Sequence, residues 1–424
     1  MGLWVLLLGC GIENAEPERQ PNVLLILVDT LRKDHLHLYG YERRTSDTID
    51  ALGAEGWVLE NHIASASQTV PSTLSMMLSR HPSEHGFVHL ENRQFQMNRP
   101  RYPEAFLFLA EVFRDAGYAT AAFVSNPFLQ RENGFAQGFE TFLHSEERAE
   151  TLTLPALVWL AGRASEPARP FFLYMHYFDV HWPYDPPPEY RDRFPIPKDA
   201  RPIYNNGPFP GAKPDDLAAT ISLYDGEIAF VDGQIAQILD ALERLGVQDD
   251  TILVVTSDHG DEFLDHGGLG HGTTVYGELV RVPLVLVFPG RLEPGRRIEY
   301  LTHHIDLAPT LAAFAGIETP PAFRGRSLFE PADRAFAENG PWRAVYDSDR
   351  KLVLNRKTGE VTVFDRRDEL DQHPLSDQPG RARLLEHLDW YQQLERDTAG
   401  SVPDASAPWT ESEVEKLRAL GYVD

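Results

Sequence analysis

Cysteine is nearly absent from this chain of 424 residues, which contains a single one, Cys10. One cysteine excludes an internal disulfide framework. Basic side chains are also scarce, because 39 Lys and Arg residues stand against 64 Asp and Glu residues, and the formal net charge is -25. A surface of this charge repels polyanions, so the composition predicts a protein that does not bind nucleic acid.

Long hydrophobic runs are missing as well, because no segment after the first ten residues is apolar enough to span a bilayer. At the start, Leu3 to Leu8 are apolar and residues 7–10 resemble a bacterial lipobox. This pattern predicts cleavage before Cys10, lipidation of its thiol, and a polar tether, so residues 1–20 are interpreted as a lipoprotein-type signal and tether. The protein would then be periplasmic or in the cell envelope, and would reach the membrane only through its lipid anchor. The alternative is a chance cysteine after a short apolar start, since no Lys or Arg precedes the run.

Short apolar strands alternate with amphipathic helical stretches from Asn22 to about Leu328, which is typical of an α/β fold. Later segments indicate a small antiparallel sheet with strands at 343–346, 351–354 and 361–364. We therefore expect a catalytic α/β domain over 21–330, whose mostly parallel sheet is flanked by helices, and a small α+β subdomain over 331–424. Helices are expected over residues 48–55, 71–78, 105–116, 217–245, 305–315, 382–396 and 411–420.

Two segments that are apolar throughout end in acidic residues. Residues 22–28 precede Asp29, and residues 251–257 precede Asp258 and His259. Strands that are apolar on both faces belong to buried parallel sheets, and such sheets place their functional groups at the carboxyl ends of the strands. We therefore expect these three side chains to meet, and two carboxylates with an imidazole suit a divalent metal ion.

Thr69 could complete this site as a further ligand and as an activated nucleophile. It lies just before Pro71, which is tolerated in the first turn of a helix, so a helix is expected to begin here. Metal coordination and the positive end of a helix would both favour the alkoxide of Thr69. A Thr beside a Pro is otherwise usually a cap or turn residue.

Two more histidines, His266 and His271, follow His259 in a Gly-rich loop, and a run of three histidines after one strand suggests a metal or anion site. Asp179 and His181 follow another apolar segment, in a Pro-rich loop. Together with His271 they could bind a second ion, because an Asp, His, His set suits zinc or manganese. Alternatively, the two histidines contact the substrate anion, and Asp179 orients a neighbouring histidine.

Seven groups of short motifs occur in order along the chain: Val28-Asp29-Thr30-Leu31-Arg32 with Tyr39-Gly40, Thr69-Val70-Pro71-Ser72, Ser125-Asn126-Pro127, His176-Tyr177-Phe178-Asp179 with His181-Trp182-Pro183-Tyr184, Tyr224-Asp225-Gly226-Glu227-Ile228, Ser257-Asp258-His259-Gly260, and His304-Ile305-Asp306-Leu307-Ala308-Pro309-Thr310. Together they resemble the bacterial sulfatase-type branch of the alkaline phosphatase superfamily. The resemblance covers residues 22–328 and implies an ester hydrolase with that fold and a divalent metal ion, either calcium or zinc or manganese. It also implies that Asp29, Asp258 and His259 are metal ligands, that Thr69 is the nucleophile, and that His181 and His271 reach the transferring group.

The chain also departs from this family. Sulfatases generally carry a Cys or Ser that is oxidised to formylglycine at the Thr69 position, and Thr cannot be converted in this way. Further family residues, namely an acidic metal ligand and the Arg, Lys and His groups that grip sulfate, are replaced by Thr30, Thr73, Ser125, Pro127 and His271. An unmodified Thr resembles instead the phosphodiesterases, phosphotransferases and phosphoglycerate mutases of the superfamily, which form a phospho-enzyme.

We therefore predict a metal-dependent hydrolase of phosphoric or sulfuric esters, with phosphoryl chemistry preferred and Thr69 as nucleophile. The substrate would be an ester of a glycan or of a small aryl or alkyl group. Trp182 or Tyr184 could stack on that group, or else pack the long loop that contains them. Two alternatives stay open: an envelope phosphotransferase on the same fold, and a catalytically degenerate binding protein.

Overall fold

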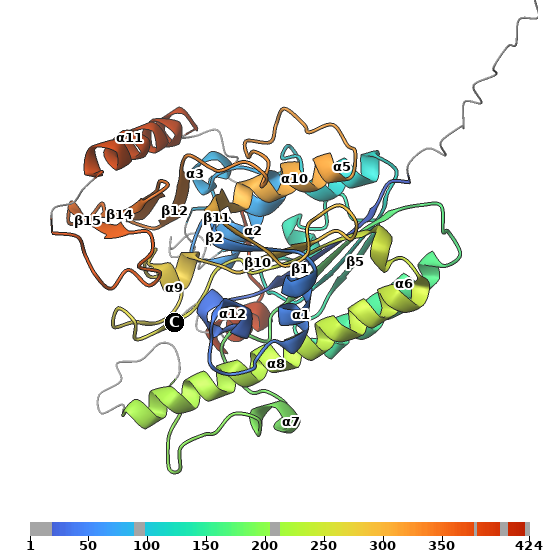
Figure 1. The fold of residues 1–424 in the computed structure, drawn as a ribbon, viewed down its shortest axis with the longest axis horizontal. Coiled ribbons are helices and arrows are strands. Elements are labelled where there is room, and N and C mark those ends of the chain that lie inside the picture. Colours follow the sequence, from blue (N-terminus) through green and yellow to red (C-terminus); the bar gives the residue numbers. More distant parts are fainter. Residues whose placement is uncertain (1–18, 89–97, 204–212, 377–379, 399–405, 420–424) are drawn as a thin grey trace, which may run out of the picture.

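The computed structural model describes residues 19–88, 98–203, 213–376, 380–398 and 406–419, and the description of the fold refers to these residues. An eight-stranded sheet forms the centre, with the strand order β11-β2-β10-β7-β1-β6-β4-β5 (Figure 1). Its strands are β1 (Asn22–Val28), β2 (Trp57–Ile63), β4 (Ala119–Val124), β5 (Thr141–His144), β6 (Phe171–Tyr177), β7 (Thr251–Thr256), β10 (Leu284–Val287) and β11 (Arg296–His303).

The middle of this sheet is parallel. β1 pairs in parallel with β6 on one side and β7 on the other, and Leu27 stands in register with both His176 and Thr256. β4 and β5 continue the parallel arrangement, β2 pairs in parallel with β11, and β10 runs antiparallel to β7 and β2. The segments that follow β1, β6 and β7 therefore leave the sheet at one edge, and the predicted mostly parallel α/β sheet is confirmed.

Helices cover both faces of the sheet (Figure 1). One face packs against α2 (Thr69–Leu78), α5 (Leu109–Asp115) and α10 (Leu307–Phe314), and the other against α1 (Asp47–Glu55), α6 (Glu150–Arg163) and α8 (Pro214–Leu245). Successive residues of β1 belong to different cores, since Leu25 packs with the first set of helices and Leu24 with the second. Burial on both faces explains why the β1 segment is apolar throughout.

A smaller antiparallel sheet follows, with the order β12-β13-β14-β15. Its strands are β12 (Ala335–Asn339), β13 (Trp342–Tyr346), β14 (Arg350–Asn355) and β15 (Glu360–Asp365). One face packs against α11 (Arg381–Thr398) through Leu388, and Val353 on the other face lies in a core with Leu279 of α9 (Gly277–Val280). The predicted C-terminal sheet is confirmed, and β12 adds a strand to the three that were expected.

The shorter elements complete the description. They are α3 (Pro82–His85), α7 (Pro188–Arg191), α12 (Glu411–Ala419), the paired strands β3 (Asn98–Pro100) and β16 (Ser406–Pro408), and the paired strands β8 (Glu262–Phe263) and β9 (Leu269–Gly270).

Some elements differ from the prediction. The helix expected over 105–116 begins only at Leu109, because the preceding residues form a turn in which the Phe106 N–H donates to the Pro103 carbonyl. β2 and β11 were not predicted, since polar and charged residues interrupt their apolar pattern, and α6 was not predicted because it contains Pro155.

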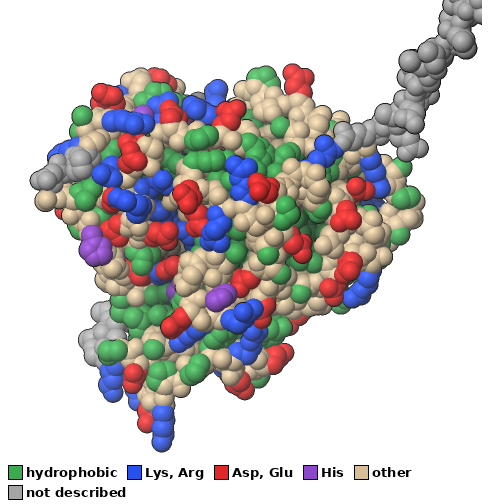
Figure 2. Space-filling model, in the orientation of Figure 1, with side chains coloured by type: hydrophobic (Ala, Val, Ile, Leu, Met, Phe, Trp, Pro, Cys, Tyr) green, Lys and Arg blue, Asp and Glu red, His purple; other side chains and the backbone are tan. Residues whose placement is uncertain are grey.

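The predicted signal and tether fall mostly on residues 1–18, which lie outside the described residues, so lipidation at Cys10 stays a prediction. In the part of the chain that the structure describes, no helix is long and apolar enough to cross a membrane. Acidic and basic side chains are interspersed on the face drawn in Figure 2, so the negative charge is not gathered into one patch there.

Candidate active site

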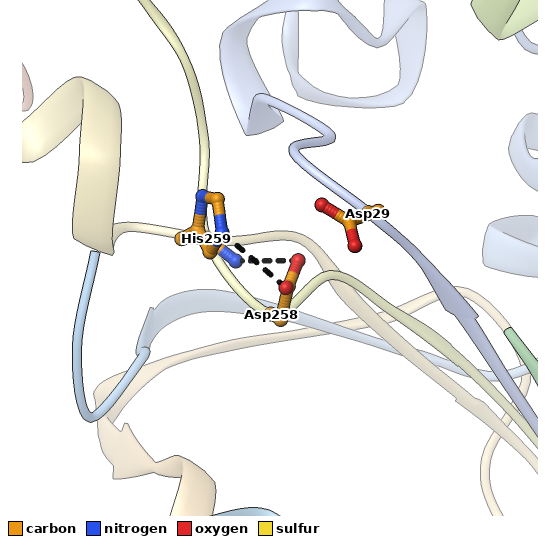
Figure 3. Close-up of side chains that lie close together, drawn as sticks. All are labelled: Asp29, Asp258 and His259. Atoms are coloured by element: carbon orange, nitrogen blue, oxygen red, sulfur yellow. Dashed lines mark hydrogen bonds and ion pairs between the residues drawn. The ribbon is translucent and has the colours of Figure 1, made fainter. Parts of the chain in front are cut away.

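Three buried side chains meet at the carboxyl edge of the central sheet. Asp29 directly follows β1, and Asp258 and His259 follow β7. All three have no exposed surface, and one ligand atom of each lies within 4.8 Å of those of the other two. Figure 3 shows the carboxylate of Asp29 on the same side of the sheet edge as Asp258 and His259. The structure thus brings together the three predicted ligands.

The unpaired oxygens of this group fit a metal ion. Asp29 Oδ1 and Asp258 Oδ2 are buried and accept no hydrogen bond from any residue that the structure describes. Burial raises the pKa of Asp29 well above its usual range, and the negative charge of Asp258 adds to this effect. His259 Nε2 lies 3.4 Å from Asp258 Oδ2, and two ligands of one tetrahedral zinc ion would be roughly 3.3 Å apart. A divalent cation would neutralise both carboxylates.

Thr69 lies beside these ligands, at the first residue of α2. Its Oγ1 is 3.4 Å from Asp29 Oδ2 and 3.3 Å from His259 Nε2. The helix is fixed to the metal group one turn later, where Ser72 Oγ donates to the Asp258 carbonyl at 2.7 Å. The predicted position of Thr69 at a helix start is therefore observed, and the positive end of α2 faces the site.

Two residues that were not assigned a role hold Asp29 in place. Asn126 Nδ2 donates to Asp29 Oδ2 at 2.9 Å, and His176 Nε2 lies 3.0 Å from the same oxygen. Burial lowers the pKa of His176 to about 4, so its imidazole is neutral, and its Nδ1 accepts from the Tyr174 hydroxyl at 2.9 Å. His176 therefore donates to Asp29 through Nε2, which leaves Oδ1 for a metal.

Asp258 is held by backbone N–H groups. Its Oδ1 accepts from Thr30 at 3.2 Å and from His259 at 2.9 Å, so only Oδ2 is available to a cation. Thr30 has a φ of 55°, in the left-handed region, and this conformation turns its N–H toward Asp258. Its hydroxyl donates to the Val180 carbonyl at 2.8 Å. Thr30 therefore supports the Asp258 carboxylate through its backbone.

His271 and His181 continue from His259 as a row of imidazole rings. The ring centroids of His259 and His271 are 4.6 Å apart, and those of His271 and His181 are 4.8 Å apart. His271 Nδ1 lies 2.9 Å from Asp261 Oδ1, and Asp261 also accepts a hydrogen bond from the Tyr184 hydroxyl. Tyr184 is buried, so it packs its loop and is not free to stack on a substrate.

The environments of His271 and His181 shift the pKa values of these two histidines in opposite directions. Burial opposes protonation of His271, but its hydrogen bond to Asp261 and the nearby carboxylates outweigh burial and raise its pKa. Burial and the neighbouring His271 lower the pKa of His181 well below its usual range. A pair of this kind can present one cationic and one neutral imidazole to the same ligand.

Two predicted residues lie elsewhere. Among the described residues, Asp179 belongs to neither of the two groups that could hold a metal ion. Its Oδ1 accepts from the Ala149 N–H at 3.0 Å, just before α6, and burial raises its pKa to about 7. His266 points away from His259 and contacts Glu278. A second ion on Asp179, His181 and His271 stays a prediction, since Asp179 Oδ1 is turned to the start of α6 while its buried Oδ2 accepts no hydrogen bond from any described residue.

Comparisons with known proteins agree with this geometry. The family model described as Sulfatase matches residues 21–317. An arylsulfatase of Clostridium perfringens is 24% identical over 455 residues, covering 88% of this chain and 92% of that protein. Among solved structures, a phosphonate monoester hydrolase from Silicibacter pomeroyi has a TM-score of 0.72 at 21% identity, covering 89% of this chain and 96% of its own. A protein solved with its substrate D-glucosamine-2-N,6-O-disulfate has a TM-score of 0.72 at 18% identity, covering 90% and 99%.

The family model spans more than half of the chain, and its region contains Asp29, Thr69, Asp258, His259 and His271. Sulfatases generally use a divalent metal ion, which suits the unpaired carboxylate oxygens described above. The chain is therefore an ester hydrolase that belongs to the sulfatase family of the alkaline phosphatase superfamily.

Proposed function

We propose that this protein is a metal-dependent hydrolase of phosphoric or sulfuric esters that prefers phosphoryl substrates and uses Thr69 as its nucleophile. The observation that carries the proposal is the position of Thr69 Oγ1, which lies 3.3 to 3.4 Å from atoms of two metal-ligand side chains at the start of a helix. A hydroxyl so placed can share an ion with Asp29, Asp258 and His259.

The ion would be calcium, zinc or manganese, held by these three side chains and by Thr69. When bound, it would lower the pKa of the Thr69 hydroxyl and neutralise charge on the ester oxygens. The chain itself directs the hydroxyl proton, because Thr69 Oγ1 donates toward Asp29 Oδ2 at 3.4 Å. Asn126 and His176 keep that oxygen in place.

The reaction would have two steps. Thr69 Oγ1 attacks phosphorus, the bond from phosphorus to the alcohol oxygen breaks, and the alcohol leaves with a proton. Water then attacks the phosphothreonine, releases phosphate and restores the hydroxyl. The imidazolium of His271, stabilised by Asp261, stands beside this centre and would stabilise the negative charge that develops on the transferring group. The neutral His181 donates from Nδ1 to the Trp182 carbonyl, so its Nε2 would accept a hydrogen bond on the same side.

The preference for phosphoryl substrates follows from the nucleophile. Formylglycine carries two hydroxyls as a hydrate, so one of them can expel sulfate after the other has been sulfated. Thr69 has one hydroxyl, and a sulfated Thr69 would need direct attack by water. A solved relative named a phosphonate monoester hydrolase has the same architecture, which supports phosphoryl chemistry on this fold.

Two parts of the proposal concern the surroundings of the enzyme. The substrate would be a glycan ester or a small aryl or alkyl ester, and the relative solved with its substrate, a sulfated glucosamine, supports a sugar ester. Lipidation at Cys10 would place the enzyme in the periplasm or cell envelope, attached only by that lipid.

The test compares wild type with Thr69→Ala on matched 4-nitrophenyl phosphate, bis(4-nitrophenyl) phosphate and 4-nitrophenyl sulfate. We expect faster cleavage of a phosphoester than of the sulfate. In Thr69→Ala the turnover of the phosphoester should fall by at least ~1000-fold, because catalytic residues act as a unit and removing the nucleophile disables all of them. Thr153→Ala is the matched control, because Thr153 is equally buried but lies on α6.

Retained turnover in Thr69→Ala would exclude Thr69 as the nucleophile, and preferred sulfate cleavage would overturn the phosphoryl preference. Added alcohols separate the hydrolase from the alternative phosphotransferase, because a transferase would convert them to phosphate esters. Wild type that binds no divalent ion and cleaves none of the three substrates would favour the degenerate binding protein.

A further inference from the structure

A second group of two carboxylates and one imidazole lies outside the active site. Glu262 belongs to β8, Glu278 to α9, and His266 to the loop between β8 and β9, and one ligand atom of each lies within 4.8 Å of those of the other two. α9 lies next to the C-terminal sheet (Figure 1). We propose that Glu262, His266 and Glu278 form a second divalent metal site, of the kind that takes zinc or manganese.

The hydrogen bonds of His266 leave one ring nitrogen aimed into this group. Its Nε2 lies 3.2 Å from the carbonyl oxygen of Asp371, which can only accept, so Nε2 carries the proton in a neutral ring. Nδ1 then presents a lone pair to Glu278 Oε1 at 3.0 Å. Two acceptors at this distance need either a proton on Nδ1 or a metal cation beside them. A metal-binding histidine commonly donates its other N–H to a carbonyl in this way.

Glu278 provides the second observation that points to a ligand. Its side chain is fully buried, and its Oε2 accepts no hydrogen bond from any described residue. A buried carboxylate oxygen without a donor is unfavourable unless a cation contacts it. Glu278 therefore has one oxygen toward His266 and a second that a metal ion would satisfy.

Glu262 is positioned by the hairpin itself. It is 2% exposed, and its Oε1 accepts from the N–H groups of His266 at 2.9 Å and of Gly268 at 2.6 Å. A Cβ on Gly268 would lie 2.6 Å from Glu262 Oε2, so a glycine at this position leaves the second oxygen room for a ligand. The fixed Oε1 orients the carboxylate, as hydrogen bonds commonly do for metal-binding carboxylates.

Arg32, a basic side chain that contacts Asp265 of the same loop, already has its partners. The Arg32 guanidinium, which is almost fully buried, donates to Asp34 and Asp265 and to the Asp261 carbonyl. In the described part of the chain, neither Glu262 nor Glu278 forms an ion pair with a lysine or arginine. A proton on His266 would compensate one negative charge, whereas a divalent ion compensates both.

This site would hold the loop that carries His271. The loop runs from β8 through β9 to α9, so its two ends bear Glu262 and Glu278. His266 also stacks on Tyr276, with ring centroids 3.8 Å apart, and bonds to Asp371 near the C-terminal sheet. An ion here would clamp both ends of the loop and fix the distance between His271 and the active site.

The test counts ions and does not depend on turnover. Full-length wild type and variants are stripped with a chelator, loaded with Zn²⁺ or Mn²⁺, separated from free metal and analysed by mass spectrometry. We expect two ions per chain in wild type, and one in each of Asp258→Asn, Glu278→Gln and His266→Gln. In His266→Gln the amide can still donate to Asp371, so this variant removes the Nδ1 ligand and spares that contact. Glu227→Gln is the matched control, since Glu227 is a buried glutamate outside both groups, and it should keep two ions.

The thermal unfolding midpoint gives an independent measurement. In Asp258→Asn, added Zn²⁺ or Mn²⁺ should still raise the midpoint, and adding Glu278→Gln should abolish this rise. Loss of a residue that only supports a metal ligand lowers metal affinity by ~10- to 100-fold. We expect Glu278→Gln and His266→Gln to lower the affinity of the second site by more than this. The proposal is overturned if Glu278→Gln and His266→Gln bind as many ions as wild type, or if Asp258→Asn binds none.

Discussion

The two groups, each of two carboxylates and one imidazole, have the same functional groups but are supported by different elements. Asp29, Asp258 and His259 stand at the ends of neighbouring parallel strands, where backbone N–H groups, Asn126 and His176 fix one oxygen of each carboxylate. Glu262, His266 and Glu278 stand on a hairpin, a loop and a four-residue helix. The difference teaches that ligand type alone does not assign a role: strand ends hold reacting groups rigidly, whereas a group spread over loops is suited to joining segments.

The largest effect should separate the two groups in a turnover assay. Asp258→Asn removes a charge from the active-site group, and we expect kcat/KM for a phosphoester to fall by at least ~1000-fold, since the ion contributes several kcal/mol to the transition state. Glu278→Gln should lower it by about tenfold or less. Steady-state kinetics of the two variants, each loaded with saturating metal, measures the contrast. Equal losses of kcat/KM in the two variants would contradict the view that only the group with Asp258 takes part in the reaction.

His271 lies on the loop between the groups, so its variant tests whether its effect is electrostatic. His271→Gln removes the cationic imidazole, and we expect kcat/KM to fall by roughly 100-fold, comparable with loss of one donor to a developing charge. Because the ion-binding residues stay intact, excess Mn²⁺ should not restore activity. The metal content of the variant, measured alongside kinetics, provides the control. Restoration by metal would mean that the residue acts through ion binding.

Arg32 connects the segments that carry the two groups, and its loss should affect stability. Arg32→Met leaves the partly buried carboxylates of Asp34 and Asp265 without their partner, so the free energy of unfolding should fall by about 3 kcal/mol. Urea unfolding followed by fluorescence measures this change. As a control, Arg114→Met removes an exposed pair with Asp115 and should cost less than ~1 kcal/mol. Similar losses in the two variants would contradict a connecting role.

The smallest effect concerns a buried carboxylate that has no histidine or metal partner. Burial raises the pKa of Glu227 to about 9, from an ordinary value of 4.5. Between these values the folded chain holds a proton that the unfolded chain has lost, so stability falls as pH rises, by at most ~1.4 kcal/mol per pH unit.

Glu227→Gln lacks this proton and should therefore lose less stability than wild type between pH 6.5 and pH 7.5, by at most ~1.4 kcal/mol. Urea unfolding at both values measures the two slopes. Identical slopes would show that Glu227 is not protonated in the folded chain. The expected result would show that this protein can bury a carboxylate by protonating it. The two groups compared above are instead proposed to bury their carboxylates beside a cation.

The active-site core could be predicted because its residues follow simple patterns. Asp29 and Asp258 each follow an apolar segment, and Thr69 precedes a proline at a helix start. Because parallel strands end at the same edge of a sheet, these patterns were sufficient to predict that the three residues meet. His176 was missed as a supporting residue because it lies inside an apolar strand, where its hydrogen bond to Asp29 depends on the strand order. Asp261 was missed as the partner of His271 for a similar reason.

The directions of the side chains on the loops could not be predicted from the sequence. His259, His266 and His271 look like one run in the sequence, yet the β8–β9 hairpin turns His266 toward Glu278 and leaves His271 beside His259. Asp179 and His181 are two residues apart and still point to different places. Such directions depend on the path of each loop and on its packing, which sequence periodicity does not contain.

The parallel pairing of β1 with β7 has a consequence for the growing chain. Thr30, which follows Asp29, and Asp258 are 228 positions apart in the sequence. The side chains that follow β7 therefore join Asp29 only after most of the chain has been synthesised. Pairings of such long range form slowly, and chains of this size commonly pass through partly folded intermediates. A ribosome-bound chain that stops before residue 251 can contain β1, β4 and β6, but it lacks Asp258 and His259 of the proposed ion site. Catalytic competence would therefore arise late in synthesis.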